Sequence, residues 1–143
     1  MKQISTQTRQ TIFPAVRYTN AHAAIDWLQR AFGATVHARH DNPDGTVAHA
    51  ELSIAGNLIM LGESNADGEY PVRSPKQVNA VTSSFYVVLP DEAAVDALHE
   101  RAKIAGARIS HAPYDTDYGS HDFSAFDLDG YPWTFGTYDP LVD

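Results

Sequence analysis

The stretch TIFPAVRYTNAHAAIDWLQRAFGA, residues 11–34, joins a strand pattern directly to a helix pattern. Residues 11–18 are rich in strand-favouring residues, and their single proline suits an edge strand or a bulge. Asn20 is a preferred N-terminal helix cap, and Gly33 stands where a left-handed C-terminal cap is expected. Between these caps, apolar residues recur at spacings of three and four, which predicts one buried helix face. They are Ala24, Ile25, Leu28, Ala31 and Phe32.

Three further strand patterns follow this helix and are separated by turn sequences. Asn42-Pro43-Asp44-Gly45 lies between the first two, and Ala55-Gly56 lies between the second and third. Residues 11–63 are therefore predicted to form one βαβββ module. The expected strands are residues 35–41, 47–54 and 57–62.

Residues 64–79 are polar and contain two prolines and a glycine, which is typical of a linker or a long surface loop. The pattern of strand and helix then repeats over residues 80–138. Pro90-Asp91 favours a helix start, Gly106 favours its end, and Asp129-Gly130 predicts a hairpin turn. The expected strands of this second βαβββ module are residues 81–89, 108–114, 120–127 and 132–138.

The two halves repeat with a nearly constant offset. Gly33 and Gly106 lie 73 residues apart, and each is followed by alanine. Gly56 and Gly130, both before a last strand, lie 74 residues apart. Such an offset indicates an internal duplication, although two ordinary α+β segments can also resemble each other by chance.

One module of roughly 55 residues is too small to bury its sheet alone, so the two modules should pack together. We therefore predict a single α+β domain over residues 1–143. Its two βαβββ modules form curved mixed sheets around a cleft, with each helix covering one face of its own sheet.

Composition excludes several function classes. The net charge of −8, without a basic run, disfavours binding to nucleic acid and to anionic membrane surfaces. No apolar stretch approaches the ~20 residues that cross a bilayer. The chain has no cysteine, which excludes disulfides and thiolate chemistry. Because residues 1–10 lack an apolar signal segment, we expect a cytoplasmic protein.

Strand alternation predicts which side chains face the cleft. In the 47–54 strand, His49 and Glu51 share the face opposite the helix, about 7 Å apart along the strand. Arg17 shares a strand face with Phe13. It either reaches solvent near the strand end or lies buried in the cleft, where it needs a carboxylate partner, for which Glu51 is a candidate, or an anionic ligand. The residues expected to face the helix in the 47–54 strand are Ala48, Ala50, Leu52 and Ile54. Those expected in the cleft from the second module are Ser84, Tyr86, Val88 and Thr134.

Paired βαβββ modules resemble the vicinal oxygen chelate superfamily, which includes glyoxalase I, extradiol dioxygenases and bleomycin-resistance proteins. Residues 12–34 resemble its opening strand and helix. The stretch TDYGSHDFSAFDLDGYPWTFGTY, residues 116–138, is similar to the closing strands of the glyoxalase/bleomycin-resistance branch, and in particular of its PhnB-like members. Leu128 replaces the proline usual in this turn, and His121 stands where the family often has arginine.

This resemblance implies four metal-ligand positions, two per module, normally filled by His, Glu or Gln. Matched onto this sequence, they fall on Phe13, Met60, Ser84 and Thr134. A phenyl ring and a thioether cannot replace imidazole and carboxylate for a divalent ion. The family's fold is therefore expected without its usual metal site.

The leading hypothesis is a homodimeric, bleomycin-resistance-like protein that binds a small organic ligand without a cofactor. Aromatic stacking would hold the ligand, with Phe13, Tyr86, Tyr118, Phe123 and Tyr131 as candidate rings. The alternative is a metal-dependent lyase or dioxygenase with a displaced site on His49 and Glu51, to which His121 could be added as a third residue. The sequence leaves open whether the protein is an enzyme. The predicted ligand-binding residues are Phe13, Arg17, His49, Glu51, Ser84, Tyr86, Tyr118, His121 and Thr134.

Overall fold

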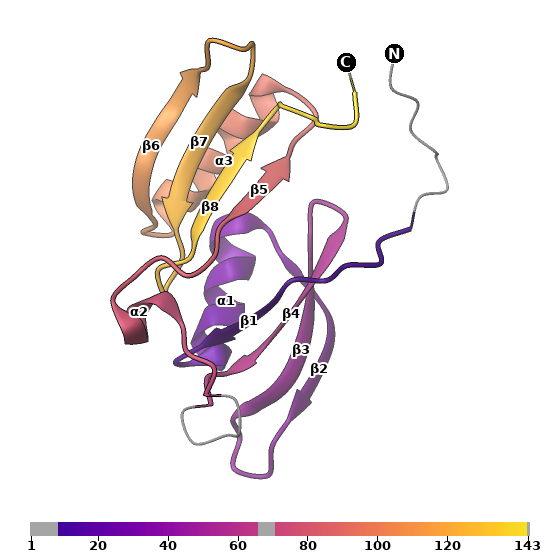
Figure 1. Ribbon diagram of the computed structural model, residues 1–143, viewed down its shortest axis with the longest axis vertical. Coiled ribbons are helices and arrows are strands. Elements are labelled where there is room, and N and C mark those ends of the chain that lie inside the picture. Colours follow the sequence, from indigo (N-terminus) through magenta and orange to yellow (C-terminus); the bar gives the residue numbers. More distant parts are fainter. Residues whose placement is uncertain (1–8, 66–70, 143) are drawn as a thin grey trace.

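The computed structural model describes residues 9–65 and 71–142, which form two four-stranded mixed sheets with helices (Figure 1). The first sheet has the strand order β1-β4-β3-β2, in which β1 runs parallel to β4 and the other neighbours are antiparallel. The side chain of Asn20 caps the N-terminus of the first helix, and Gly33, with a φ of 71°, caps its C-terminus. The elements are β1 (Ala15–Tyr18), α1 (Ala21–Phe32), β2 (Thr35–Asp41), β3 (Val47–Ile54) and β4 (Asn57–Glu63).

The second sheet repeats this arrangement, with the order β5-β8-β7-β6 and a parallel β5–β8 pair. Asp91 caps its helix by accepting a hydrogen bond from the Ala94 amide. The predicted α+β fold of two βαβββ units is thus confirmed. The elements are α2 (Pro75–Val78), β5 (Phe85–Val88), α3 (Glu92–Ile104), β6 (Arg108–Asp115), β7 (His121–Phe126) and β8 (Pro132–Gly136).

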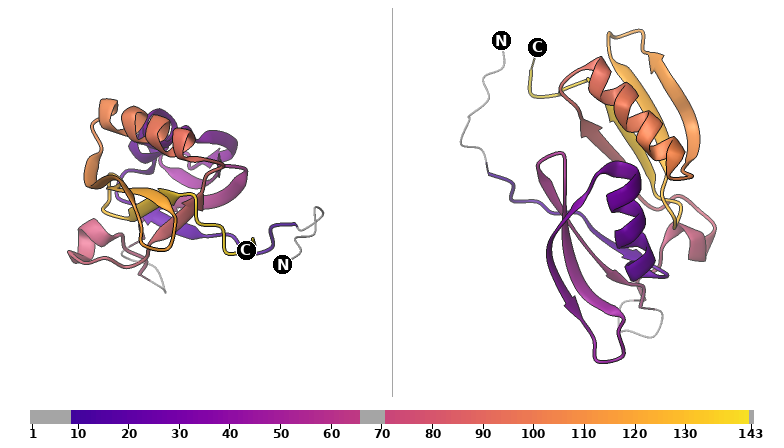
Figure 2. Two further views of the ribbon diagram at one scale, coloured as in Figure 1. Left: turned by 90° about the horizontal axis from the view of Figure 1, so that it is seen from above. Right: turned by 180° about the vertical axis from the view of Figure 1, so that it is seen from behind.

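Both long helices lie on the same side of the two sheets, as the views from above and from behind show (Figure 2). The core lies between the helices and the sheets and joins the modules. The Phe32 ring of α1 contacts the rings of Trp133 and Phe135 of β8, with centroids 5.4 and 4.8 Å away. Neither α1 nor α3 lies on the opposite face of the sheets, and we call this face of each sheet its open face.

A buried carboxylate also connects the modules. Asp127 Oδ2 accepts hydrogen bonds from the Tyr18 hydroxyl at 2.7 Å and from Trp133 Nε1 at 3.0 Å. Its Oδ1 accepts from the amides of Asp129 and Tyr131. Burial raises the pKa of Asp127, and these four donors oppose that shift.

Three local expectations were wrong. The first strand begins at Ala15 rather than at residue 11. The predicted linker contains a short helix, α2, at whose start the Gln77 side chain accepts a hydrogen bond from the Ser74 amide at 2.8 Å. A register shift in the β2–β3 ladder leaves Ala48 exposed and Val47 buried, the reverse of the alternation expected there.

No helix in the described part of the chain is long and apolar enough to span a bilayer.

Candidate functional site

His49 and Glu51 lie together on the open face of the first sheet, as predicted. They alternate along β3 with the buried Ala50 and Leu52. His49 Nε2 lies 2.8 Å from Glu51 Oε2, and this hydrogen bond lowers the pKa of Glu51. The pair is therefore an imidazole held against an ionised carboxylate.

Two further histidines join this pair, and sequence reasoning did not place them there. The His40 ring stacks on His49 with centroids 6.4 Å apart, because the two residues are cross-strand partners in β2 and β3. His37 Nε2 lies 4.0 Å from Glu51 Oε1. The hairpin Asn42–Gly45 fixes this register, so pairing β2 with β3 in the sequence could have brought His40 to His49.

Arg17 also lies on this open face, because its β1 neighbours Val16 and Tyr18 are buried on the helix side. Its Nη1 donates to the carbonyl oxygen of Glu63 at 3.3 Å. The expected pairing with Glu51 is not formed, and no carboxylate of residues 9–65 or 71–142 lies within ion-pair distance of this guanidinium. A hollow of about 160 Å³ adjoins it, lined by Ala15, Val16, Arg17, His49, Met60 and Leu61.

Tyr86 dominates the open face of the second sheet. It alternates with Phe85 and Val87, which pack against the core, and 41% of its surface is exposed. Its hydroxyl donates to Asp122 Oδ1 at 3.3 Å and accepts from the Tyr138 amide at 3.0 Å. Partial burial raises the pKa of Tyr86.

Gly136 makes this contact possible. A β-carbon at this position would collide with the Asp122 carboxylate and the Tyr86 hydroxyl. Tyr138 and Tyr118 extend the aromatic surface, with ring centroids 5.8 Å apart. Asp122 and Tyr138 were not predicted. The pairing of β7 with β8 places Asp122 opposite Gly136, and this pairing could have revealed Asp122 from the sequence.

A larger hollow of about 340 Å³ lies where the modules meet. It is lined mainly by apolar side chains of both modules. Of the predicted ligand-binding residues, only Tyr86 contributes to it. The lining residues are Gln10, Ile12, Pro14, Ile54, Asn57, Leu58, Ile59, Phe85, Tyr86, Val87, Val88 and Trp133.

His121 lies away from His49 and Glu51, contrary to the suggestion that it approaches them from the other module. It lies two residues from the buried Phe123 on β7 and shares its strand face, so it faces the helix side of its own sheet. Its Nδ1 lies 2.7 Å from Asp115 Oδ1, and its Nε2 lies 2.7 Å from Asp96 Oδ1 of α3. These hydrogen bonds raise the pKa of His121 to about 9.

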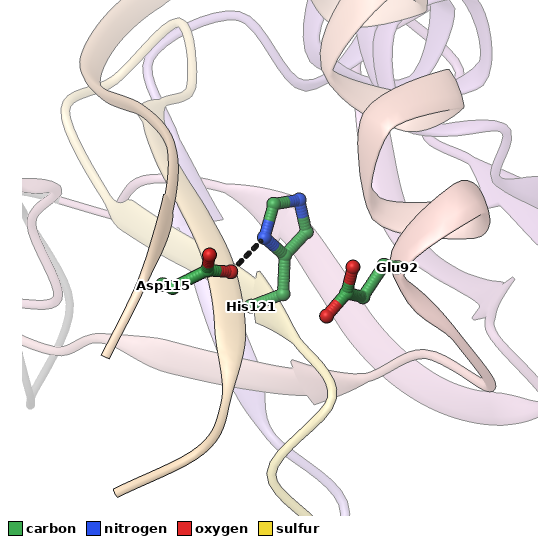
Figure 3. A group of neighbouring side chains, drawn as sticks. All are labelled: Glu92, Asp115 and His121. Carbon is green, nitrogen blue, oxygen red and sulfur yellow. Dashed lines mark hydrogen bonds and ion pairs between the residues drawn. The ribbon is translucent and has the colours of Figure 1, made fainter. Parts of the chain in front are cut away.

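Glu92 approaches the same imidazole (Figure 3). One ligand atom each from Glu92, Asp115 and His121 lie within 4.8 Å of one another, close enough to surround a cation. Both ring nitrogens of His121 already contact carboxylates, so the group is satisfied as an imidazolium among acidic side chains.

The remaining predicted residues are dispersed. Phe13 is half-buried and precedes β1, whereas Ser84 is exposed and precedes β5. Thr134 lies on the open face, where its hydroxyl is 2.7 Å from Ser124 Oγ. Two of the candidate rings, Phe123 and Tyr131, belong to the buried core rather than to a groove.

These features define a two-module protein with helices on one side and open sheet faces on the other. The chain belongs to the Glyoxalase/Bleomycin resistance protein/Dioxygenase superfamily, whose sequence profile matches residues 12–135.

Relatives with similar sequences or structures cover most of the chain. An uncharacterized protein of Mycobacterium tuberculosis, Rv0887c, is 29% identical over 126 residues, which span 86% of this chain and 71% of that protein. The structure of TioX from Micromonospora sp. ML1 superposes with a TM-score of 0.69 at 27% identity, covering 94% of this chain and all of TioX. Glyoxalase I from Zea mays shares the fold at 19% identity and a TM-score of 0.66, over 87% of this chain and 43% of its own.

The internal repeat tests whether the family's metal would fit. Met60 pairs with Ala15 in the first module, and Thr134 pairs with Tyr86 in the second. Phe13 and Ser84 each stand two residues before those partners, so all four residues occupy matching positions. A phenyl ring, a thioether and two hydroxyls do not suit a divalent ion that prefers imidazole and carboxylate. The residues at these positions do not fit the metal.

Proposed function

We propose that this protein binds a small, flat organic molecule on its open sheet faces, without a divalent metal at the four repeated positions. The main observation that supports this proposal is the exposed ring of Tyr86 on the open face of the second sheet. This ring borders a hollow of about 340 Å³ between the modules. That volume is at the lower end of the range for small-molecule sites.

Binding would combine stacking with a few directional contacts. An aromatic pair contributes roughly 0.5–1.5 kcal/mol beyond the burial of its surface. Tyr118 and Tyr138 offer further rings beside Tyr86, while His49, Glu51 and Arg17 offer polar groups in the first module. None of these groups is an activated nucleophile, which favours binding over covalent chemistry.

We also propose a homodimer. Within the described residues both long helices lie on the other side of the sheets, and Tyr86 and Val88 keep 41% and 37% of their surface exposed. A second copy that covers these faces would turn two shallow surfaces into closed clefts.

The metal-dependent enzyme is the weaker proposal. Its displaced site consisted of His49 and Glu51 with His121 as an optional third ligand, and His121 instead contacts Asp96 and Asp115 in its own module.

The proposal is tested with three naphthalene probes of matched shape: naphthalene-2-carboxylate, naphthalene-2-carboxamide and 2-naphthylmethylamine. Amide chemical shifts are followed by NMR during titration. We expect at least one probe to shift amides of the open faces and to bind Tyr86→Ala about two- to tenfold more weakly than the wild type. Ile104→Ala, at an exposed site on α3, is the control and should bind normally. Binding of no probe, or shifts confined to the helices, would contradict the proposal.

A further inference from the structure

We infer that the ligand of this site carries a carboxylate, and that Arg17 binds it on the open face of the first sheet. This inference rests on the proposed function, because it names the chemistry of the molecule that the open faces bind.

A glycine on the neighbouring strand leaves space for the Arg17 side chain. Gly62 is its pairing partner in β4, and a β-carbon at Gly62 would lie 2.8 Å from Arg17 Nη1. The backbone of this glycine does not have the positive φ that would by itself favour glycine. The missing side chain instead gives the guanidinium room to lie over β4, where the Glu63 carbonyl accepts its Nη1 hydrogen bond at 3.3 Å.

Among residues 9–65 and 71–142, most of this guanidinium has no hydrogen-bond partner. An arginine side chain has five N–H donors. Among the described residues, the Arg17 side chain donates one hydrogen bond, to the carbonyl oxygen of Glu63. Burying a cation even partly is costly unless an anion compensates it. A planar carboxylate, which can accept two parallel hydrogen bonds, matches the guanidinium in both geometry and charge.

The residues around Arg17 favour the carboxylate of a bound ligand over a carboxylate of the protein as its partner. Glu51, the carboxylate of the same face, is engaged by His49 at 2.8 Å and lies 4.0 Å from His37. The adjoining hollow of about 160 Å³ is lined by Arg17 and His49 on its polar side and by Ala15 and Met60 on its apolar side. A carboxylate attached to a flat apolar ring would satisfy both sides.

The net charge of −8 predicts a mild preference for cations at long range, which is opposite to this inference. Salt screens such a field beyond about 10 Å at 0.1 M ionic strength. Direct contact between Arg17 and a carboxylate therefore has more influence on binding at this site than the long-range field of the net charge.

The test compares naphthalene-2-carboxylate with naphthalene-2-carboxamide, which have the same ring and nearly the same shape. Titration calorimetry gives the affinities, and the Gly62 amide shift locates the bound acid. The wild type should bind the acid at least about tenfold more tightly than the amide. Arg17→Gln should reduce this ratio to about one. Arg30→Gln removes the same charge from α1, where Arg30 pairs with Asp26, and should preserve the ratio.

The outcomes separate this inference from the proposed function. Equal affinity of acid and amide for the wild type, or an unchanged preference in Arg17→Gln, overturns the inference and leaves the proposed function standing. Failure of both probes, and of the matched amine, contradicts the proposed function itself. The wild-type comparison decides the matter even if Arg17→Gln does not fold.

Discussion

His121 provides a pH-dependent connection between α3 and the β6–β7 hairpin, and replacing it with glutamine should remove that pH dependence. Its two ring nitrogens contact Asp96 and Asp115, each at 2.7 Å. Figure 3 shows Asp115 and Glu92 beside the imidazole. The hydrogen bonds to Asp96 and Asp115 stabilise the imidazolium and raise its pKa from 6.5 to about 9.

The sign follows from proton linkage. A pKa raised in the folded state stabilises the fold fully below the unfolded value of 6.5, and this stabilisation is lost as the pH rises through about 9. A shift of this size corresponds to an upper limit of about 3 kcal/mol. Asp96 and Asp115 are 58% and 79% exposed, so solvent screening reduces the expected effect to about 1 kcal/mol.

Urea unfolding of the wild type and His121→Gln, measured at about pH 6 and about pH 9.5, gives the free energies of unfolding. The wild type should lose about 1 kcal/mol more than the variant between these pH values. His111→Gln is the matched control, because His111 is exposed on β6 and contacts Ser110 rather than a carboxylate. Equal losses in the wild type and His121→Gln would refute this reasoning.

Three other substitutions test the packing that positions the open faces, each by urea unfolding against the wild type. Asp127→Asn should cost about 2–3 kcal/mol, because each carboxylate oxygen accepts two hydrogen bonds and the amide nitrogen would face two of the four donors; a cost below that of the exposed control Asp117→Asn would contradict this. Gly136→Ala should cost about 1–3 kcal/mol, because its methyl group would displace Asp122 and Tyr86; a neutral result would show that these groups move freely. Phe32→Ala should cost about 3–5 kcal/mol through the cavity left against β8, and a loss under 1 kcal/mol would contradict the shared core.

Features encoded by local pattern were predictable from the sequence. Asn20 and Gly33 cap α1 as expected, and β2 and β3 have the predicted bounds. The internal offset anticipated two sheets with the same strand order. These features depend on residues near one another in the chain, where capping, alternation and turn preferences act directly.

Features set by pairing between strands were less accessible. β1 starts late because its ladder with β4 begins at the Ala15–Met60 pair, and residues 11–14 have no strand partner in it. The shift at Ala48 depends on the β2 register, which the pattern of β3 alone does not contain.

The positions of the candidate site residues were predicted in part for the same reason. His49 and Glu51 lie on one strand, so alternation sufficed to bring them together. His121 was assigned to the wrong neighbours because its shared strand face with Phe123 and Ala125 was not taken into account. The absence of an Arg17–Glu51 pair depends on side-chain direction across Gly62, which requires the structure.

The central claim is that the open faces bind an organic molecule without help from a divalent ion. The most direct measurement is the dissociation constant of the tightest naphthalene probe for tag-free protein in EDTA and again with added Mn²⁺, Ni²⁺ or Zn²⁺. We predict the same constant in every condition. Binding that appears only when a metal is added would contradict the claim.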